Sequence, residues 1–127
     1  MSRTFRDLSE EEIKKYREAL VKREKERKKA VERRFHKAWD LVRKMSKILH
    51  EKYHAKEVIV FGSMIDLSCF NEWSDIDIAI VGIPDDLYFK AVAEILSMSE
   101  DFDIDIVDVE SCSESLKKVI MEKGIRI

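Results

Sequence analysis

The stretch VIVFGSMIDLSCFNEWSDIDIAIV, residues 58–81, decides the fold of this chain. It begins with an apolar run at residues 58–61, bounded by a charged residue and a glycine, which is typical of a buried β-strand. A Gly-Ser pair follows, and residues 64–70 are expected to form a short helix. Apolar and polar residues then alternate over residues 74–81, which predicts a second strand with one buried face.

Two carboxylates project from one side of the second predicted strand. Side chains alternate along a strand, so Asp75 and Asp77 point together while Ile76 and Ile78 point to the core. Their Cα atoms are expected roughly 6.6 Å apart, at ~3.3 Å per residue, which suits two divalent ions ~3.5–4 Å apart. A half-exposed strand with acidic residues on its solvent-facing side also explains the Asp-x-Asp pattern. This pattern alone therefore does not distinguish a metal site from an exposed strand.

The Gly-Ser pair favours the metal-site interpretation. Gly62 has no Cβ and lets a ligand approach the backbone closely. Ser63 follows where a helix would begin, so its N–H and hydroxyl are placed to meet a phosphate at the positive helix end.

Several separated motifs occur in one order along the chain. They are Phe-Gly-Ser at residues 61–63, Ser-Asp-Ile-Asp at 74–77, and Ile-Asp-Ile-Val-Asp at 104–108, followed by a predicted helix and glycine at 116–124. Together they resemble the minimal nucleotidyltransferases of the DNA polymerase β superfamily. The resemblance covers roughly residues 35–127.

The resemblance implies both a fold and a reaction. The fold is α/β, the polymerase β-like nucleotidyltransferase core, in which a small mixed sheet carries helices mainly on one face. The reaction is metal-dependent nucleotidyl transfer, with ATP as substrate and two Mg²⁺ ions as cofactors. An acceptor hydroxyl attacks the α-phosphorus of ATP, and pyrophosphate leaves.

The same resemblance assigns roles to five residues. Asp75 and Asp77 would hold both Mg²⁺ ions, and Asp105 would hold the ion that lowers the pKa of the acceptor hydroxyl. Gly62 and Ser63 would bind the β- and γ-phosphates through backbone N–H groups and the hydroxyl.

Two positions close to these motifs leave questions open. Trp73 either stacks on the base or ribose of the nucleotide or closes the core beneath the loop. Met64 stands where the family usually has Arg, so a cationic side chain near the triphosphate is lost. This departure leaves both nucleotide affinity and catalytic activity open.

Small members of this family commonly pair with HEPN-domain proteins in toxin–antitoxin modules. The resemblance therefore implies an antitoxin that transfers AMP to a hydroxyl of a HEPN-type toxin, a tyrosine in the leading hypothesis. Two alternatives remain. One is a catalytically weak module that neutralises its partner by covering it, and the other is a nucleotidyltransferase that acts on a small molecule.

Composition limits the setting of the chain. Its 127 residues suffice for one modest core, and two cysteines do not make a disulfide framework. No apolar run approaches the ~20 residues that span a bilayer, and the N-terminus lacks a signal-peptide core, so a cytoplasmic protein is expected. Residues 1–56 hold 19 Lys and Arg against 10 Asp and Glu, a net charge of +9. Residues 57–127 hold 5 against 16, a net charge of −11, so the chain has a basic first part and an acidic second part.

A long helical region precedes the motifs. Ser9 and Glu12 form a capping box, and neither Pro nor Gly occurs from there to Tyr53, which predicts one or two long helices. Residues 1–34 are interpreted as a charged extension and residues 35–127 as the nucleotidyltransferase domain. Apolar residues recur at alternating spacings of four and three on the side expected to face the sheet: Val31, Phe35, Ala38, Val42, Met45 and Leu49.

The extension has its own short apolar stripe, Ile13, Tyr16 and Leu20, beyond a fully charged run at residues 22–29. It is either a solvated helix held by Glu–Lys pairs or an arm for self-association or partner binding. Nucleic-acid binding is disfavoured because the run has no interleaved aromatic residues and contains glutamates. A straight helix is expected to overhang the core by several turns.

The chain after residue 81 is expected to hold three more elements. A helix follows Pro84, with its buried face formed by Tyr88 or Phe89, Ala91 or Val92, Ile95 and Leu96. Residues 102–107 alternate and predict a strand. A last helix is capped by Ser111 or Ser113 and is stopped by Gly124, after which residues 125–127 form a terminal strand.

Overall fold

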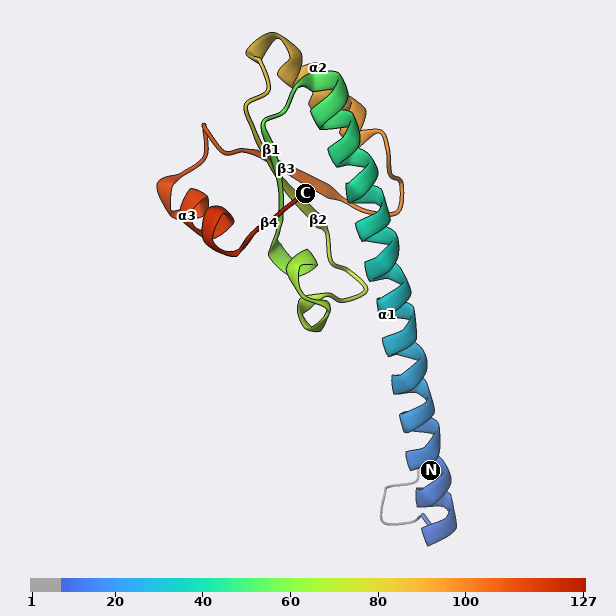
Figure 1. Cartoon of the computed structure of the whole chain (residues 1–127). Coiled ribbons are helices and arrows are strands. Elements are labelled where there is room, and N and C mark those ends of the chain that lie inside the picture. The colour runs from blue at the N-terminus through green and yellow to red at the C-terminus, as the bar shows by residue number, and fades with distance from the viewer. Residues whose placement is uncertain (1–7) are drawn as a thin grey trace, which may run out of the picture.

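The computed structural model describes residues 8–127, so the first residues of the predicted extension lie outside it (Figure 1). The α-helices are α1 (Glu10–Tyr53), α2 (Asp85–Leu96) and α3 (Glu114–Lys123); the 3₁₀ helices are η2 (Gly62–Ile65) and η3 (Leu67–Cys69); the strands are β1 (Glu57–Phe61), β2 (Ile76–Val81), β3 (Ile104–Asp108) and β4 (Ile125–Arg126). In this part of the chain, no helix has an apolar stretch long enough to span a membrane.

The four strands form one mixed sheet in the order β3-β2-β1-β4. Strand β1 is antiparallel to both of its neighbours, β2 and β4, whereas β2 and β3 are parallel. Parallel neighbours need a crossover, which α2 provides. Both acidic strands therefore begin at the same edge of the sheet, and the small mixed sheet that the motifs predicted is confirmed.

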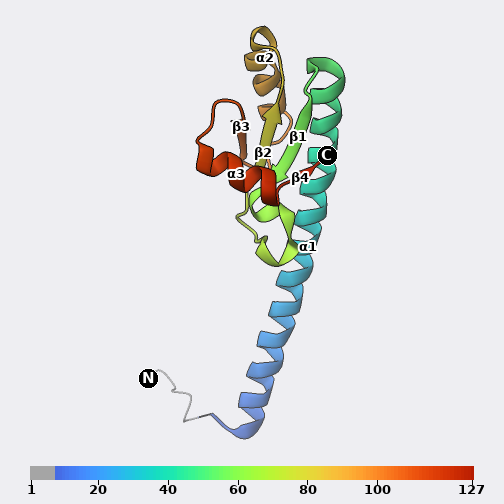
Figure 2. The ribbon, with the colours of Figure 1, turned by 60° about the vertical axis from the view of Figure 1, so that its left-hand side comes forward.

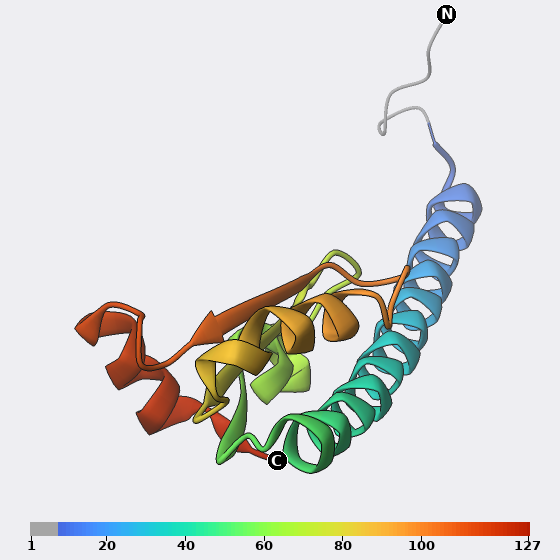
Figure 3. The ribbon, with the colours of Figure 1, turned by 90° about the horizontal axis from the view of Figure 1, so that it is seen from above.

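The sheet has a buried core on each face. Helices α1 and α2 cover one face, as predicted, and α3 packs on the other (Figure 3). Alternation along the strands decides which residues go where, so Ile76 and Ile78 enter the larger core while Ala79 points to the α3 side. The smaller cluster has four buried members: Ile59, Ala79, Val109 and Ile120.

Helix α1 is one continuous helix of 44 residues, about 66 Å long at ~1.5 Å per residue. Ser9 caps it by accepting a hydrogen bond from the Glu12 N–H at 3.1 Å, as predicted. Its C-terminal part packs on the sheet, and its N-terminal part projects well beyond it (Figure 2). The six residues of the predicted seam all join the larger core, with Val31 and Phe35 only partly buried.

The segment after β1 differs from the single short helix expected at residues 64–70. It forms two 3₁₀ turns, η2 and η3, separated by Asp66 in an extended conformation. The Asp66 carboxylate accepts a hydrogen bond from the Ser68 N–H at 3.0 Å. Such a local side-chain bond competes with helical bonding and explains the break.

The buried side of α2 was predicted only in part. Ala91 and Ile95 are fully buried, and Leu87, four residues before Ala91, packs against the same core. Phe89 is 83% exposed and Leu96 is 47% exposed, so the expectation of a buried Leu96 was wrong. The helical spacing of four residues turns those two positions away from the sheet.

The predicted C-terminal elements are confirmed. Ser113 caps α3 by accepting from the Leu116 N–H at 3.2 Å, and Gly124 ends the helix before β4. Gly124 has a φ of −69°, so it is not needed for a left-handed turn. A Cβ there would lie 2.3 Å from Ile59 Cγ2, so close packing on β1 is the reason for a glycine.

Candidate active site

Asp77 and Asp105 lie side by side on the two acidic strands, β2 and its neighbour at the edge of the sheet, β3. They are partners in the parallel register of β2 and β3, where neighbouring strands are ~4.8 Å apart. Both alternate with core-facing isoleucines, so their side chains share the face that carries Ala79. Asp75 precedes β2, two residues before Asp77, and is half-buried.

The surroundings of Asp77 disfavour its charged form. Burial is the main cause, followed by the charge of Asp105, a hydrogen bond with Asp105, and the charge of Asp75; together they raise the pKa of Asp77 from 3.8 to about 6. Carboxylates that repel one another in this way are stabilised by a shared proton or by a cation. The three predicted residues are therefore electrostatic neighbours.

These carboxylates do not form a complete ligand cluster. Across residues 8–127, no group of three His, Cys, Asp or Glu side chains is arranged to hold a metal ion. The structure thus provides the Asp77–Asp105 pair with Asp75 nearby, and the assignment of Asp75, Asp77 and Asp105 as metal ligands stays a prediction.

The side chain of Asp77 occupies the space that a Cβ on Gly62 would need. The φ of Gly62 is +72°, which an L side chain rarely adopts, and a Cβ there would lie 2.3 Å from the Asp77 Oδ2. The antiparallel register pairs Phe61 with Asp77, which brings the next residue against the carboxylate. Glycine is therefore required to keep the Asp77 side chain in place, and Ser63 follows directly in η2.

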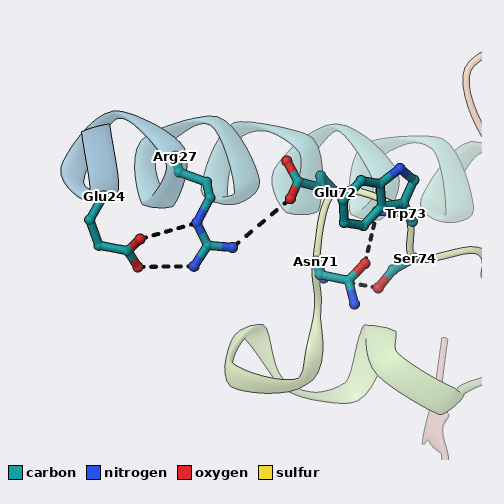
Figure 4. A network of polar contacts seen from close by, with 6 residues as sticks. All are labelled: Glu24, Arg27, Asn71, Glu72, Trp73 and Ser74. Atoms are coloured by element: carbon teal, nitrogen blue, oxygen red, sulfur yellow. Dashed lines mark hydrogen bonds and ion pairs between the residues drawn. The ribbon is translucent and has the colours of Figure 1, made fainter. Parts of the chain in front are cut away.

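Trp73 does not close the core. Its side chain is 80% exposed, so of the two interpretations left open, the structural one is wrong. The Trp73 N–H donates to Asn71 Oδ1 at 2.8 Å, and the Asn71 N–H donates to Ser74 Oγ at 2.9 Å (Figure 4). These bonds form a compact turn that presents the indole beside the start of β2.

Met64 points into the core. Its side chain is fully buried, and its carbonyl accepts a hydrogen bond from Trp39 Nε1 at 3.1 Å. A side chain at this position faces α1 rather than the acidic face of the sheet. In this chain, the absence of Arg at position 64 is therefore a weak indication of low affinity for a triphosphate.

Residues of α1 also reach the turns that precede the two acidic strands. Arg34 donates to the Ser74 carbonyl at 3.2 Å and to the Asp101 carbonyl at 3.3 Å. Arg27 lies 4.0 Å from Glu72 (Figure 4). The sequence analysis missed Arg34, because an arginine within a highly charged helix carries no signal that separates a tertiary contact from a solvated side chain.

Comparison with known proteins agrees with the predicted family. A family model described as "Polymerase beta, Nucleotidyltransferase" matches residues 43–127, more than half of the chain. Among curated proteins, none matches.

Solved structures of toxin–antitoxin systems share the fold. Two mutants of the toxin–antitoxin MntA-HpeT match with TM-scores of 0.52, at 23% and 25% sequence identity, over 66% and 67% of this chain and 69% of each of theirs. A toxin–antitoxin with AMP-PNP matches with a TM-score of 0.51 and 23% identity, over 68% of this chain and 69% of that one.

Proposed function

The chain belongs to the polymerase beta nucleotidyltransferase family, and on that premise we propose that it transfers AMP from ATP to a hydroxyl of a partner protein. The observation that carries this proposal is the pairing of Asp77 with Asp105 in the parallel register of β2 and β3, with Asp75 close enough to influence the pKa of Asp77. The acceptor oxygen bonds to the α-phosphorus while the bond from phosphorus to the pyrophosphate oxygen breaks.

The donor atoms fit Mg²⁺. All three side chains offer carboxylate oxygens, which Mg²⁺ prefers. Burial is the main cause of the raised pKa of Asp77, and the charges of Asp105 and Asp75, which a divalent cation would offset, add to it. Asp75 and Asp77 would hold two ions, and Asp105 would share the one nearest the acceptor. Mg²⁺ held by these residues would lower the pKa of the attacking hydroxyl and stabilise charge on the phosphate oxygens.

The residues around the carboxylates would hold the nucleotide. Gly62 and Ser63 would bind the terminal phosphates through backbone N–H groups and the hydroxyl, next to the carboxylate of Asp77. Trp73, which is 80% exposed at the start of β2, would stack on the base. A solved toxin–antitoxin of the same fold with AMP-PNP supports an adenine nucleotide as the ligand class.

We propose a HEPN-domain toxin as the partner and acceptor. The support is the likeness to the MntA-HpeT toxin–antitoxin, at 25% identity and a TM-score of 0.52. This chain would then act as the antitoxin of its pair, and a tyrosine hydroxyl of the toxin would receive the AMP.

Transfer of labelled AMP from ATP to the co-expressed partner tests the proposal. The Asp75→Ala, Asp77→Ala double variant should abolish labelling while remaining folded, because both residues are only half-buried and neither belongs to a hydrophobic core. The Asp85→Ala, Asp86→Ala double variant makes the same two changes in the exposed first turn of α2 and is the control. Undiminished labelling by the double variant would refute the mechanism.

A binding module without catalysis is the second candidate. The observation that favours it is the exposed apolar surface on the overhanging part of α1, where Tyr16, Leu20 and Val21 are 54%, 44% and 56% exposed. In that case the double carboxylate variant would still neutralise the partner in cells. Loss of neutralisation together with loss of labelling supports the enzyme instead.

A further inference from the structure

We infer that Arg34 is a positioning residue for the acidic site: from α1 it joins the turn before β2 to the turn before β3 and so sets where Asp75, Asp77 and Asp105 stand relative to one another. This inference rests on the proposed function. Arg34 lies before residues 43–127, the part that the family model matches, so it is a feature of this chain's own N-terminal helix.

The Arg34 guanidinium has three contacts with the two turns. One terminal nitrogen donates to the Ser74 carbonyl at 3.2 Å, and the other donates to the Asp101 carbonyl at 3.3 Å. The guanidinium carbon lies 4.2 Å from the centre of the Phe102 ring. A planar guanidinium can donate to two carbonyls and stack on an aromatic ring at the same time. The ammonium group of a lysine does not have this geometry.

The bonded carbonyls lie a short way before the acidic residues in the chain. Ser74 is the residue before Asp75, and Asp101 is four residues before Asp105. The two turns are also bonded to each other, because the Ile76 N–H donates to the Asp103 carbonyl at 2.9 Å. A movement of either turn would therefore shift one carboxylate against the other.

Neighbouring contacts hold the same two turns. On the β2 side, Glu72 lies 4.0 Å from Arg27, which is in turn paired with Glu24 at 2.9 Å (Figure 4). On the β3 side, Lys37 pairs with the Asp101 carboxylate at 2.5 Å. These pairs are exposed and each contacts one turn, whereas Arg34 contacts both.

The position of Arg34 is costly for stability. Its Nε is buried and has no hydrogen-bond partner among the described residues. An unpaired buried N–H destabilises the folded state, so packing alone does not account for an arginine here. Holding two carbonyls that precede metal-ligand candidates accounts for it.

A positioning role and a purely electrostatic role of Arg34 predict opposite changes in the affinity of Arg34→Met for a divalent cation. If Arg34 acts only through its positive charge, Arg34→Met removes repulsion and strengthens the binding of a divalent cation. If Arg34 positions the carboxylates, Arg34→Met loosens both turns and weakens binding, by about 10-fold if its effect matches that of other residues that orient metal ligands.

The test uses Mn²⁺ as a probe for the site, with the full chain and without partner or ATP. Electron paramagnetic resonance gives the Mn²⁺ dissociation constant of wild type, Arg34→Met, Arg34→Lys and Asp77→Asn, well below the thermal transition of each. Arg33→Met is the matched control, since Arg33 is the exposed neighbour on the same helix and the charge change is equal. Amide hydrogen exchange at residues 74–76 and 103–105 reports the geometry independently of metal.

The inference is supported if Arg34→Met binds Mn²⁺ more weakly than wild type, Arg34→Lys shows an intermediate loss, and Arg33→Met shows none. It also requires faster amide exchange at both turns in Arg34→Met. Unchanged or tighter binding by Arg34→Met, while Asp77→Asn loses binding, would overturn it and leave the proposed function standing. If Asp77→Asn binds Mn²⁺ as wild type does, the proposed metal site is absent and the inference falls with it. Should Arg34→Met not fold, Arg34→Lys decides instead: it keeps the charge, so charge alone predicts unchanged Mn²⁺ binding and positioning predicts weaker binding.

Discussion

The two halves of α1 are both helical and free of Pro and Gly, but they have very different surroundings. Residues 31–53 pack against the sheet, whereas residues 10–30 leave most of their side chains exposed. Ile13 and Leu20 lie on the same helical face as Val31, at spacings of 18 and 11 residues, so the core-facing stripe continues past the core. Only part of this stripe has partners within the described chain.

The comparison separates what forms a helix from what stabilises a fold. The outer half has a Ser9 cap, no Pro or Gly, and charge pairs such as Arg27 with Glu24 at 2.9 Å. Pairs of this kind contribute only about 0.2–0.5 kcal/mol each, whereas most of the stability of a helix in a protein comes from tertiary packing. The inner half instead gains from buried apolar area, and the two halves should respond differently to equal changes.

Matched leucine truncations should show the largest difference. Leu49→Ala in the packed half should lower the free energy of unfolding by about 3 kcal/mol, because Leu49 is fully buried and leaves a cavity. Leu20→Ala, where Leu20 is 44% exposed, should change it by about 0.5 kcal/mol or less. Urea denaturation measures both, and an equal loss in the two variants would mean that the outer half packs against something in the free protein.

The free energy of unfolding should depend on pH through Asp77, which lies in the packed region. The pKa of Asp77 is about 6 in the folded chain and ordinarily 3.8, so the folded state binds this proton more tightly. The stabilisation is complete below about pH 4 and is lost as pH rises through 6, by about 1 kcal/mol after allowing for solvent screening of a half-exposed group. The difference in unfolding free energy between wild type and Asp77→Asn, followed over this range, should show that slope.

Deleting residues 1–30 should leave the Asp77 slope unchanged, because the causes of the raised pKa all lie in or next to β2 and β3. A slope that vanishes with the deletion would contradict this assignment. Saturating Mg²⁺ above pH 6 should oppose the loss in wild type and have no such effect in Asp77→Asn, if the proposed site binds the ion.

The two serine caps give a finer contrast. Ser9 and Ser113 each accept a hydrogen bond from the N–H three residues on, at 3.1 and 3.2 Å. Ser113→Ala should lower the unfolding free energy by about 1 kcal/mol, since α3 packs on the sheet. Ser9→Ala should fray only the outer half, seen as reduced helical circular dichroism with an unchanged denaturation midpoint. A shifted midpoint for Ser9→Ala would show that the two halves unfold together.

Removing residues 1–30 should have the smallest effect on stability. The deletion spares the packed half and Arg34, and of the contacts described here it removes one exposed tertiary pair, Arg27 with Glu72, so the unfolding free energy should change by about 0.5 kcal/mol or less. Association should weaken instead, read by light scattering of the chain alone and with its partner. An insoluble or unfolded truncated chain would mean that the outer half belongs to the core.

Much of this molecule follows from short-range patterns. Alternation at residues 74–81 and 102–107 predicted both acidic strands, and Ser9 and Ser113 marked where two helices begin. Where two local rules competed, the sequence was less informative. The side chain of Asp66 breaks a predicted helix into two turns, and Leu96 fits the apolar pattern of α2 yet lies outside the core.

By itself, the sequence determined the order of the elements, the alternation within each acidic strand, and a stretch before them, free of Pro and Gly, that had to form one helix or two. These are local properties of backbone geometry and apolar spacing. Tertiary structure alone decided that Gly62 is required by Asp77, that Trp73 is exposed, and that Arg34 joins two turns 40 and 67 residues away in the chain. Such contacts depend on how separate elements pack, and no local pattern encodes which distant carbonyl a long charged side chain will reach.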